Sequence, residues 1–179
     1  MAEAPKETWI QWVALTTTIL AVCAAISSLK ASSYSTKVQL YTTMEANGWA
    51  YFQAKNIREH MLKLQRDLFV FQKMQEAKDP KVQQYLADRI KNYEADIARY
   101  SQERAEIKRD TEKIQKDQAT FKQHNASYAL AVMLLQIAIM MSAVGALIKR
   151  KSMWYVGLGF GVIGLFLMAN GHFLWILLA

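Results

Sequence analysis

The sequence predicts an all-α membrane protein with three transmembrane helices and a long antiparallel coiled-coil hairpin outside the bilayer. Three apolar stretches are each long enough to cross a hydrocarbon core of about 30 Å. Between the first two lies a charged, almost glycine-free stretch with Asp79-Pro80 at its midpoint. As helices, its two halves of about 46 residues are each about 70 Å long. They can therefore leave the bilayer, turn once and return beside their starting point.

The chain divides into six segments along its length. They are an N-terminal tail at 1–8, a first span at 9–29, the hairpin at 30–126 with its turn at 79–80, a second span at 127–148, a basic turn at 149–153 and a third span at 154–179. The first apolar run exceeds the roughly 7–15 residues of a signal peptide, so we expect it to remain as an anchor. The single cysteine, Cys23, lies inside this span, which excludes a disulfide framework and a zinc site.

Two sets of basic residues give opposite indications of orientation. Lys149, Arg150 and Lys151 fill the short turn between the second and third spans, and short basic loops stay cytoplasmic. This turn favours a cytoplasmic N-terminus with the hairpin outside. Lys30 and Lys37, just past the first span, favour the reverse. We give the short turn more weight, because long segments cross the membrane with little regard to charge.

The returning limb of the hairpin has the clearest periodic pattern. Its residues recur at alternating steps of four and three, which is the spacing of a coiled-coil seam. The positions are Leu86, Ile90, Tyr93, Ile97, Tyr100, Arg104, Ile107, Thr111, Ile114, Gln118, Phe121 and Asn125. Arg104, Thr111 and Gln118 are its polar interruptions, and polar seam residues often fix register at a cost in stability.

The outgoing limb shows two stripes that do not share one heptad frame. Close to the membrane the stripe is Tyr34, Val38, Tyr41, Glu45, Gly48 and Phe52, and near the tip it is Ile57, Met61, Leu64, Leu68 and Phe71. We expect both stripes to face the returning limb, which requires an offset of about one residue between them. The remaining apolar face, open to neighbouring copies, then comprises Leu40, Leu62, Phe69 and Tyr85.

Symmetric pairing about the turn places specific residues opposite one another. Thr111 meets Gly48, while Arg104 lies near Lys55, an unfavourable pair unless Arg104 leans one turn toward Glu59. At the turn itself, Asp79 is a suitable N-cap for the second limb, and the following proline suits the first helical turn.

An aromatic segment coincides with the expected disturbance of the coil. Its candidate interaction residues are Trp49, Tyr51, Phe52, Gln53, Lys55 and Arg58. Tryptophan and tyrosine are common anchors of protein interfaces, so the segment is a candidate contact with a partner or another copy. The alternative is structural, with the aromatic rings filling space around Gly48 and Thr111. Both interpretations stay open at this point.

The second and third spans carry features typical of helix packing in lipid. Small residues allow close backbone approach, and a polar amide often bonds to another helix. The predicted packing residues are Gln136, Gly157, Gly161 and Gly164. Asn170 and His172 interrupt the last apolar run, and we expect both at a wetted interface.

No residue cluster predicts catalysis, a cofactor or a metal. The three histidines, His60, His124 and His172, are far apart and lack a positioned acid. Basic and acidic residues interleave along the hairpin as on a solvated helix face, which argues against nucleic-acid binding. We therefore expect a non-enzymatic membrane scaffold or accessory subunit. Its expected partners are the lipid bilayer, further copies of the chain and an unidentified membrane protein. The alternative is an oligomeric channel or pore.

Two motifs carry a resemblance to a known family. They are W-A-Y-F-Q-A-K-x-I-R at 49–58 and A-x-S-S-L-K-A-x-S-Y-S at 25–35, accompanied by the glycine-rich last span. With these the chain resembles a family of uncharacterised bacterial inner-membrane proteins, a domain of unknown function, over most of its length. The resemblance implies a bacterial inner membrane, and hence a periplasmic hairpin in the favoured orientation. It implies no established activity and supplies no catalytic residues.

Overall fold

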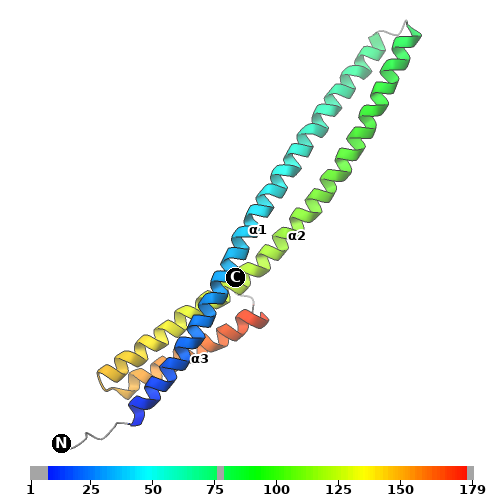
Figure 1. Cartoon of the computed structure of the whole chain (residues 1–179). Coiled ribbons are helices and arrows are strands. Elements are labelled where there is room, and N and C mark those ends of the chain that lie inside the picture. The colour runs from blue at the N-terminus through cyan, green and yellow to red at the C-terminus, as the bar shows by residue number, and fades with distance from the viewer. Residues whose placement is uncertain (1–7, 76–78, 177–179) are drawn as a thin grey trace, which may run out of the picture. The chain divides into compact units, whose positions relative to one another are not determined.

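The computed structural model describes residues 8–75 and 79–176, and these residues form three helices and no strand. The helices are α1 (Thr8–Gln75), α2 (Pro80–Leu147) and α3 (Lys151–Phe173) (Figure 1). Each is long and apolar enough to cross a membrane. Of the tail predicted at 1–8, residues 1–7 lie outside the described residues, and Thr8 already belongs to α1. The all-helical class is therefore confirmed.

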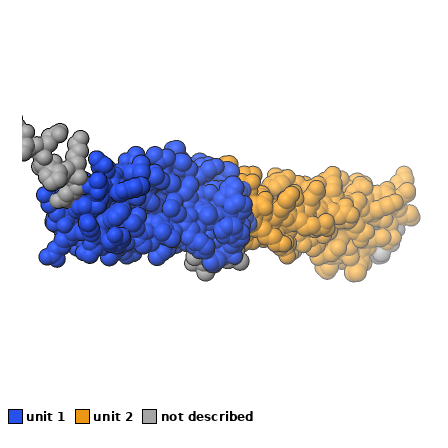
Figure 2. Space-filling view, turned by 90° about the horizontal axis from the view of Figure 1, so that it is seen from below, with its two compact units in different colours: residues 1–39, 118–179 blue, residues 40–117 orange. Residues whose placement is uncertain are grey.

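The chain separates into two compact units, coloured separately in Figure 2. Unit 1 comprises Met1–Gln39 and Gln118–Ala179, and unit 2 comprises Leu40–Asp117. Unit 1 therefore contains the beginning of α1, the end of α2 and all of α3. Unit 2 contains the remaining lengths of α1 and α2 as an antiparallel pair.

Unit 1 is built around a small apolar core. Leu20 and Ala24 of α1 pack against Leu135 and Ala138 of α2 in this core. Five other small residues of the first span lie on other faces of α1 and are exposed: Ala14, Thr18, Ala21, Ala25 and Ser28. Where α2 ends, Lys149 adopts a left-handed conformation with φ of 55°, which is a common way to terminate a helix.

The third helix ends earlier than the predicted span. Leu174 follows it in a left-handed conformation, and its N–H donates a 2.7 Å hydrogen bond to the Asn170 carbonyl. The Asn170 side chain accepts a hydrogen bond from the Ile176 N–H at 2.7 Å and donates to Ser127 Oγ at 3.2 Å. Asn170 is completely buried, so its expected place at a wetted interface is wrong.

In unit 2 the returning limb follows its predicted pattern. Every predicted seam position from Leu86 to Asn125 is buried or half-buried, including the last three, which belong to unit 1. At the turn, the Asp79 carboxylate accepts a 2.9 Å hydrogen bond from the Lys81 N–H. The predicted cap on α2 is therefore confirmed, while residues 76–78 lie outside the described part of the turn.

The outgoing limb differs from the prediction near its tip. Ten of its buried or half-buried positions keep one heptad frame throughout unit 2: Tyr41, Glu45, Gly48, Phe52, Lys55, Glu59, Leu62, Arg66, Phe69 and Lys73. Trp49, Asn56, Lys63 and Val70 are half-buried beside them. The predicted tip stripe from Ile57 to Phe71 is exposed, and the one-residue offset is absent. Leu62 and Phe69 face inward, and Phe69 stacks on Tyr93 with centroids 5.5 Å apart. Beyond Lys55 the face of α1 that was predicted to pack on α2 is therefore the exposed one. The face that does pack on α2 there includes charged residues, which is why it was not predicted.

Candidate functional site

The six predicted interaction residues do not form one surface. Phe52 and Lys55 belong to the seam, and Trp49 packs edge-on against the Phe52 ring with centroids 5.7 Å apart. Tyr51, Gln53 and Arg58 are exposed. The segment therefore contributes partly to hairpin packing and partly to the outer surface of α1.

The closest approach of the two limbs lies beside this segment. A Cβ atom at Gly48 would overlap the Thr111 hydroxyl and lie 3.1 Å from its methyl carbon. The hydroxyl donates a 2.7 Å hydrogen bond to the Ile107 carbonyl, and Thr111 is only 1% exposed. The predicted pairing of Thr111 with Gly48 is confirmed, and glycine is needed there for space.

Two turns further along, an ion pair joins the limbs. Lys55 Nζ donates a 2.5 Å hydrogen bond to Glu103 Oε2 and lies 4.8 Å from the centroid of the Tyr100 ring. The hydrogen bond from Lys55 lowers the pKa of the Glu103 carboxyl, and the same bond raises the pKa of Lys55. A lysine in the seam is thus satisfied by a carboxylate and an aromatic ring.

A second polar group surrounds Glu59, whose side chain is 2% exposed. Lys63 donates a 2.6 Å hydrogen bond to Oε1, and Arg104 Nη1 lies 3.4 Å from Oε2 as an ion pair without hydrogen-bond geometry. Arg104 also donates a hydrogen bond to Asn56. Lys63 and then Arg104 lower the pKa of Glu59 below its ordinary value of 4.5. The predicted lean of Arg104 toward Glu59 is confirmed.

We call Lys55, Asn56, Glu59, Glu103 and Arg104 the polar seam. Its two ion pairs connect α1 and α2 at fixed positions, and a slip of either limb separates them. Polar groups in such seams set register and pairing. Asn56 and Glu103 were not predicted as members, although the spacing of the Glu103 carboxylate from Lys55 and of the Asn56 amide from Arg104 indicated both.

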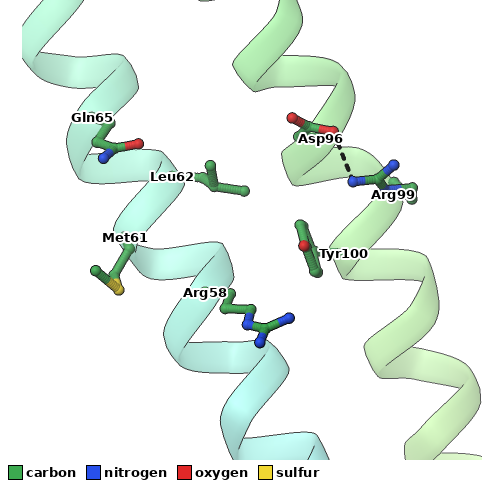
Figure 3. Close-up of a pocket in the computed structure, with 7 residues that line it drawn as sticks. All are labelled: Arg58, Met61, Leu62, Gln65, Asp96, Arg99 and Tyr100. Carbon is green, nitrogen blue, oxygen red and sulfur yellow. Dashed lines mark ion pairs between the residues drawn. The ribbon is translucent and has the colours of Figure 1, made fainter.

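The opposite face of α1 carries an apolar surface. The outer stripe consists of Ile57, Met61, Leu64, Leu68 and Phe71, each between 57% and 66% exposed. Figure 3 shows Met61 pointing away from α2 and Leu62 pointing toward it. Beside the stripe is a shallow groove of about 260 Å³, where Arg58 and Arg99 contribute guanidinium groups. Arg99 is paired with Asp96 at 2.9 Å.

In unit 1, three of the predicted packing residues lie at helix contacts. A Cβ atom at Gly157 would lie 2.8 Å from the Ala138 carbonyl oxygen, and one at Gly164 would lie 2.9 Å from Leu135 Cγ. Gly161 faces Leu20 in the same way. Gln136 does not take part in this packing, because its side chain is exposed on the outer face of α2.

The histidines occupy unrelated places. His60 and His172 are exposed, whereas a ring nitrogen of His124 lies 2.8 Å from the Gly171 carbonyl oxygen. Among the residues that the structure describes, no three His, Cys, Asp or Glu side chains are grouped so that they could hold a metal ion.

A comparison with protein families shows the family to which the chain belongs. The model of the family described as "Domain of unknown function (DUF4337)" matches residues 9–174. The chain belongs to this family. The match covers all three helices except the first residue of α1, so the hairpin and the apolar helices are both part of the family's domain. Neither the curated proteins nor the solved structures gave a match.

Proposed function

We propose that this chain is a non-enzymatic scaffold or accessory subunit of the bacterial inner membrane that self-associates through α1. Three apolar helices support membrane insertion. The proposal adopts a cytoplasmic N-terminus and a periplasmic unit 2, as the basic turn at 149–153 favours. An unidentified membrane protein is a further partner of the assembled hairpins.

The outer stripe is the observation that carries the proposal. It belongs to unit 2, outside the apolar stretches, and it repeats at steps of four and three like a coiled-coil seam. Five large side chains in one row are costly to leave in water, at about 25 cal/mol for each Å² of apolar surface. Within the described part of unit 2, Tyr85 is the one large apolar side chain exposed on α2. The matching surface is therefore the same stripe on a second copy.

Two copies that are inserted in the membrane with the same orientation can pair their α1 helices in parallel and in register. Each stripe offers on the order of 500 Å², so a symmetric pair buries about 1,000 Å², the lower bound for a specific interface. The positions that flank the stripe face one another as Gln53 with Arg58, His60 with Gln65 and Asp67 with Gln72. No two like charges are opposed in this arrangement.

Cysteine cross-linking in membranes tests this pairing. In a Cys23→Ala background, Leu64→Cys places a thiol in the stripe, and Ser101→Cys places one on the exposed surface of α2 as the matched control. Mild oxidation is expected to form disulfide dimers from the first variant in clear excess over the second. Equal yields, or native mass spectrometry that shows only monomer, would remove the proposal.

A channel is the second candidate, and the exposed amide of Gln136 favours it. Among the described residues the Gln136 side chain has no hydrogen-bond partner, so between copies it is available to line a polar path or to bond another helix. Ion flux through proteoliposomes that disappears in Gln136→Leu, with the oligomer intact, would place the channel above the scaffold. Absence of flux in the unaltered protein would exclude it.

A further inference from the structure

A groove of about 350 Å³ lies on unit 1 beside the end of α3. Ile26 and Lys30 of α1 line one side, and Leu165, Met168 and His172 of α3 line another. On α1 Ile26 precedes Lys30, and on α3 most of the apolar lining precedes His172, which Phe173 follows at the end of the helix. The groove therefore has an apolar stretch within the predicted spans and a basic end where the first span stops at residue 29.

The charged side chains in the described part of unit 1 are all basic. Its described residues, 8–39 and 118–176, include no aspartate and no glutamate. Its lysines and arginines are Lys30, Lys37, Lys122, Lys149, Arg150 and Lys151. Lys30 is exposed and consequently has no carboxylate partner among the described residues of its own unit, so its ammonium is available to an anion from outside the unit.

The floor of the groove is held by a set of specific contacts. Tyr128 lines it and is only 3% exposed, with its ring packed against Gly171, where an added Cβ would lie 3.0 Å away. The Tyr34 ring stacks on both His124 and Tyr128, with centroids 4.7 and 5.8 Å apart. His124 in turn lies 2.8 Å from the Gly171 carbonyl oxygen. A floor fixed in this way reduces the ordering cost of binding.

From these features we propose that the groove binds one anionic phospholipid. The Lys30 ammonium and an imidazole N–H of His172 bind the phosphate of its headgroup, and an acyl chain lies along Ile26, Leu165 and Met168. An amphipathic ligand with an anionic head matches both the apolar stretch and the basic end of the groove, whereas a free phosphate ion leaves the apolar stretch empty. Basic groups at a membrane surface attract anionic lipids. The inference rests on the proposed membrane insertion and adds a specific ligand to it.

Lipid retention measured by native mass spectrometry tests the site. The full-length protein is extracted from vesicles of phosphatidylglycerol and phosphatidylcholine with equal acyl chains, and the retained lipids are counted. We expect one retained phosphatidylglycerol per chain, with about fivefold less retention in Lys30→Gln, as suits the loss of one cation. Lys122→Gln, an exposed lysine that does not line the groove, is the matched control and is expected to retain the lipid. Lys30→Arg is expected to retain it as well.

Three outcomes would overturn the inference. They are equal retention in Lys30→Gln and Lys122→Gln, no preference for phosphatidylglycerol over phosphatidylcholine, or displacement of the lipid by inorganic phosphate. Helical content from circular dichroism, compared between Lys30→Gln and Lys30→Arg, separates loss of the site from loss of the fold. Membrane insertion has its own readout, because an inserted protein remains with the vesicles after an alkaline wash. Release in that wash would overturn the proposed function, whereas insertion without selective retention would overturn only the lipid site.

Discussion

Glu59 of α1 and Arg104 of α2 form an ion pair across the hairpin, at a distance of 3.4 Å, with the carboxylate almost completely buried. A buried charge is tolerated when charged and hydrogen-bonding partners surround it, and removing one partner leaves the other uncompensated. Arg104 is 29% exposed, so water relieves part of that cost. The pair therefore stabilises the observed register more than it stabilises the helices themselves.

Replacing Glu59 alone is expected to weaken unit 2. Glu59→Leu leaves Arg104 without its carboxylate, and we expect a loss of about 2 kcal/mol in the free energy of unfolding. The double variant Glu59→Leu with Arg104→Leu is expected to recover most of this loss, because an apolar pair can replace an ionic one. Thermal unfolding followed by circular dichroism measures both. Glu106→Gln, which alters an exposed carboxylate, serves as control, and equal melting temperatures for all variants would contradict the role of the pair.

The polar seam also predicts how stability depends on pH. The pKa values of Glu59 and Glu103 are lowered in the folded protein from an ordinary 4.5. Their contribution to the stability of the fold is therefore present above pH 4.5 and is lost as the pH falls through their pKa values in the folded protein. The pKa of Lys55 is raised from 10.5, so its contribution is present below that pH and is lost as the pH rises further. Stability is therefore expected to be level between these limits and to fall on both sides.

Melting temperatures measured across the acid range test this expectation. Glu103→Gln removes one of the two carboxylates and is expected to flatten the decline below pH 4.5. Asp88→Asn, at an exposed position on α2, is the control. An unchanged acid profile in Glu103→Gln would show that the ion pair with Lys55 does not contribute to stability.

The buried face could be predicted from the sequence for the returning limb but not for the tip of the outgoing limb, and the reason is physical. In the part of α2 that belongs to unit 2, one face holds nearly all the large apolar residues, so spacing alone identifies the seam from Leu86 onward. On α1 two opposite faces follow the same spacing near the tip, and the outer one is the more apolar. Periodicity then selects the wrong face, because burial is decided by the ion pairs of Glu103 and Arg104, of which the sequence indicated only the one between Arg104 and Glu59.

The structure at the end of α3 could not be predicted from the sequence, for a related reason. A single Asn170 between apolar residues is equally compatible with a wet interface and with a buried cap. One deciding partner, Ser127, lies on α2, and the other, the Ile176 backbone, follows the end of α3. By contrast the cap at Asp79 is local, since its partner is the N–H of Lys81 two residues away. The local cap at Asp79 was therefore readable from the sequence, whereas the role of Asn170 was not.

Two neighbouring leucines distinguish the inner and outer faces of α1. Leu62 is half-buried in the seam, whereas Leu64 is 66% exposed. We expect Leu62→Asn to lower the free energy of unfolding by about 2 kcal/mol, through lost apolar burial and a poorly satisfied amide. Leu64→Asn is expected to leave it nearly unchanged in monomeric protein while reducing self-association. Denaturant titration in detergent, with oligomeric state measured in parallel, tests the pair, and the reverse ranking would restore the tip stripe as the seam.

The glycines of α3 allow a matched comparison within one helix. A Cβ atom at Gly157 meets Ser142 Oγ at 2.7 Å and the Ala138 carbonyl oxygen at 2.8 Å, whereas one at Gly159 meets nothing within 4 Å. Backbone cannot move aside as a flexible side chain can, so Gly157→Ala is expected to cost about 1–3 kcal/mol by overpacking. Gly159→Ala is expected to be neutral or slightly stabilising, because alanine favours helix over glycine. Thermal unfolding of unit 1 in detergent measures the difference, and equal effects would mean that α3 does not pack closely against α2.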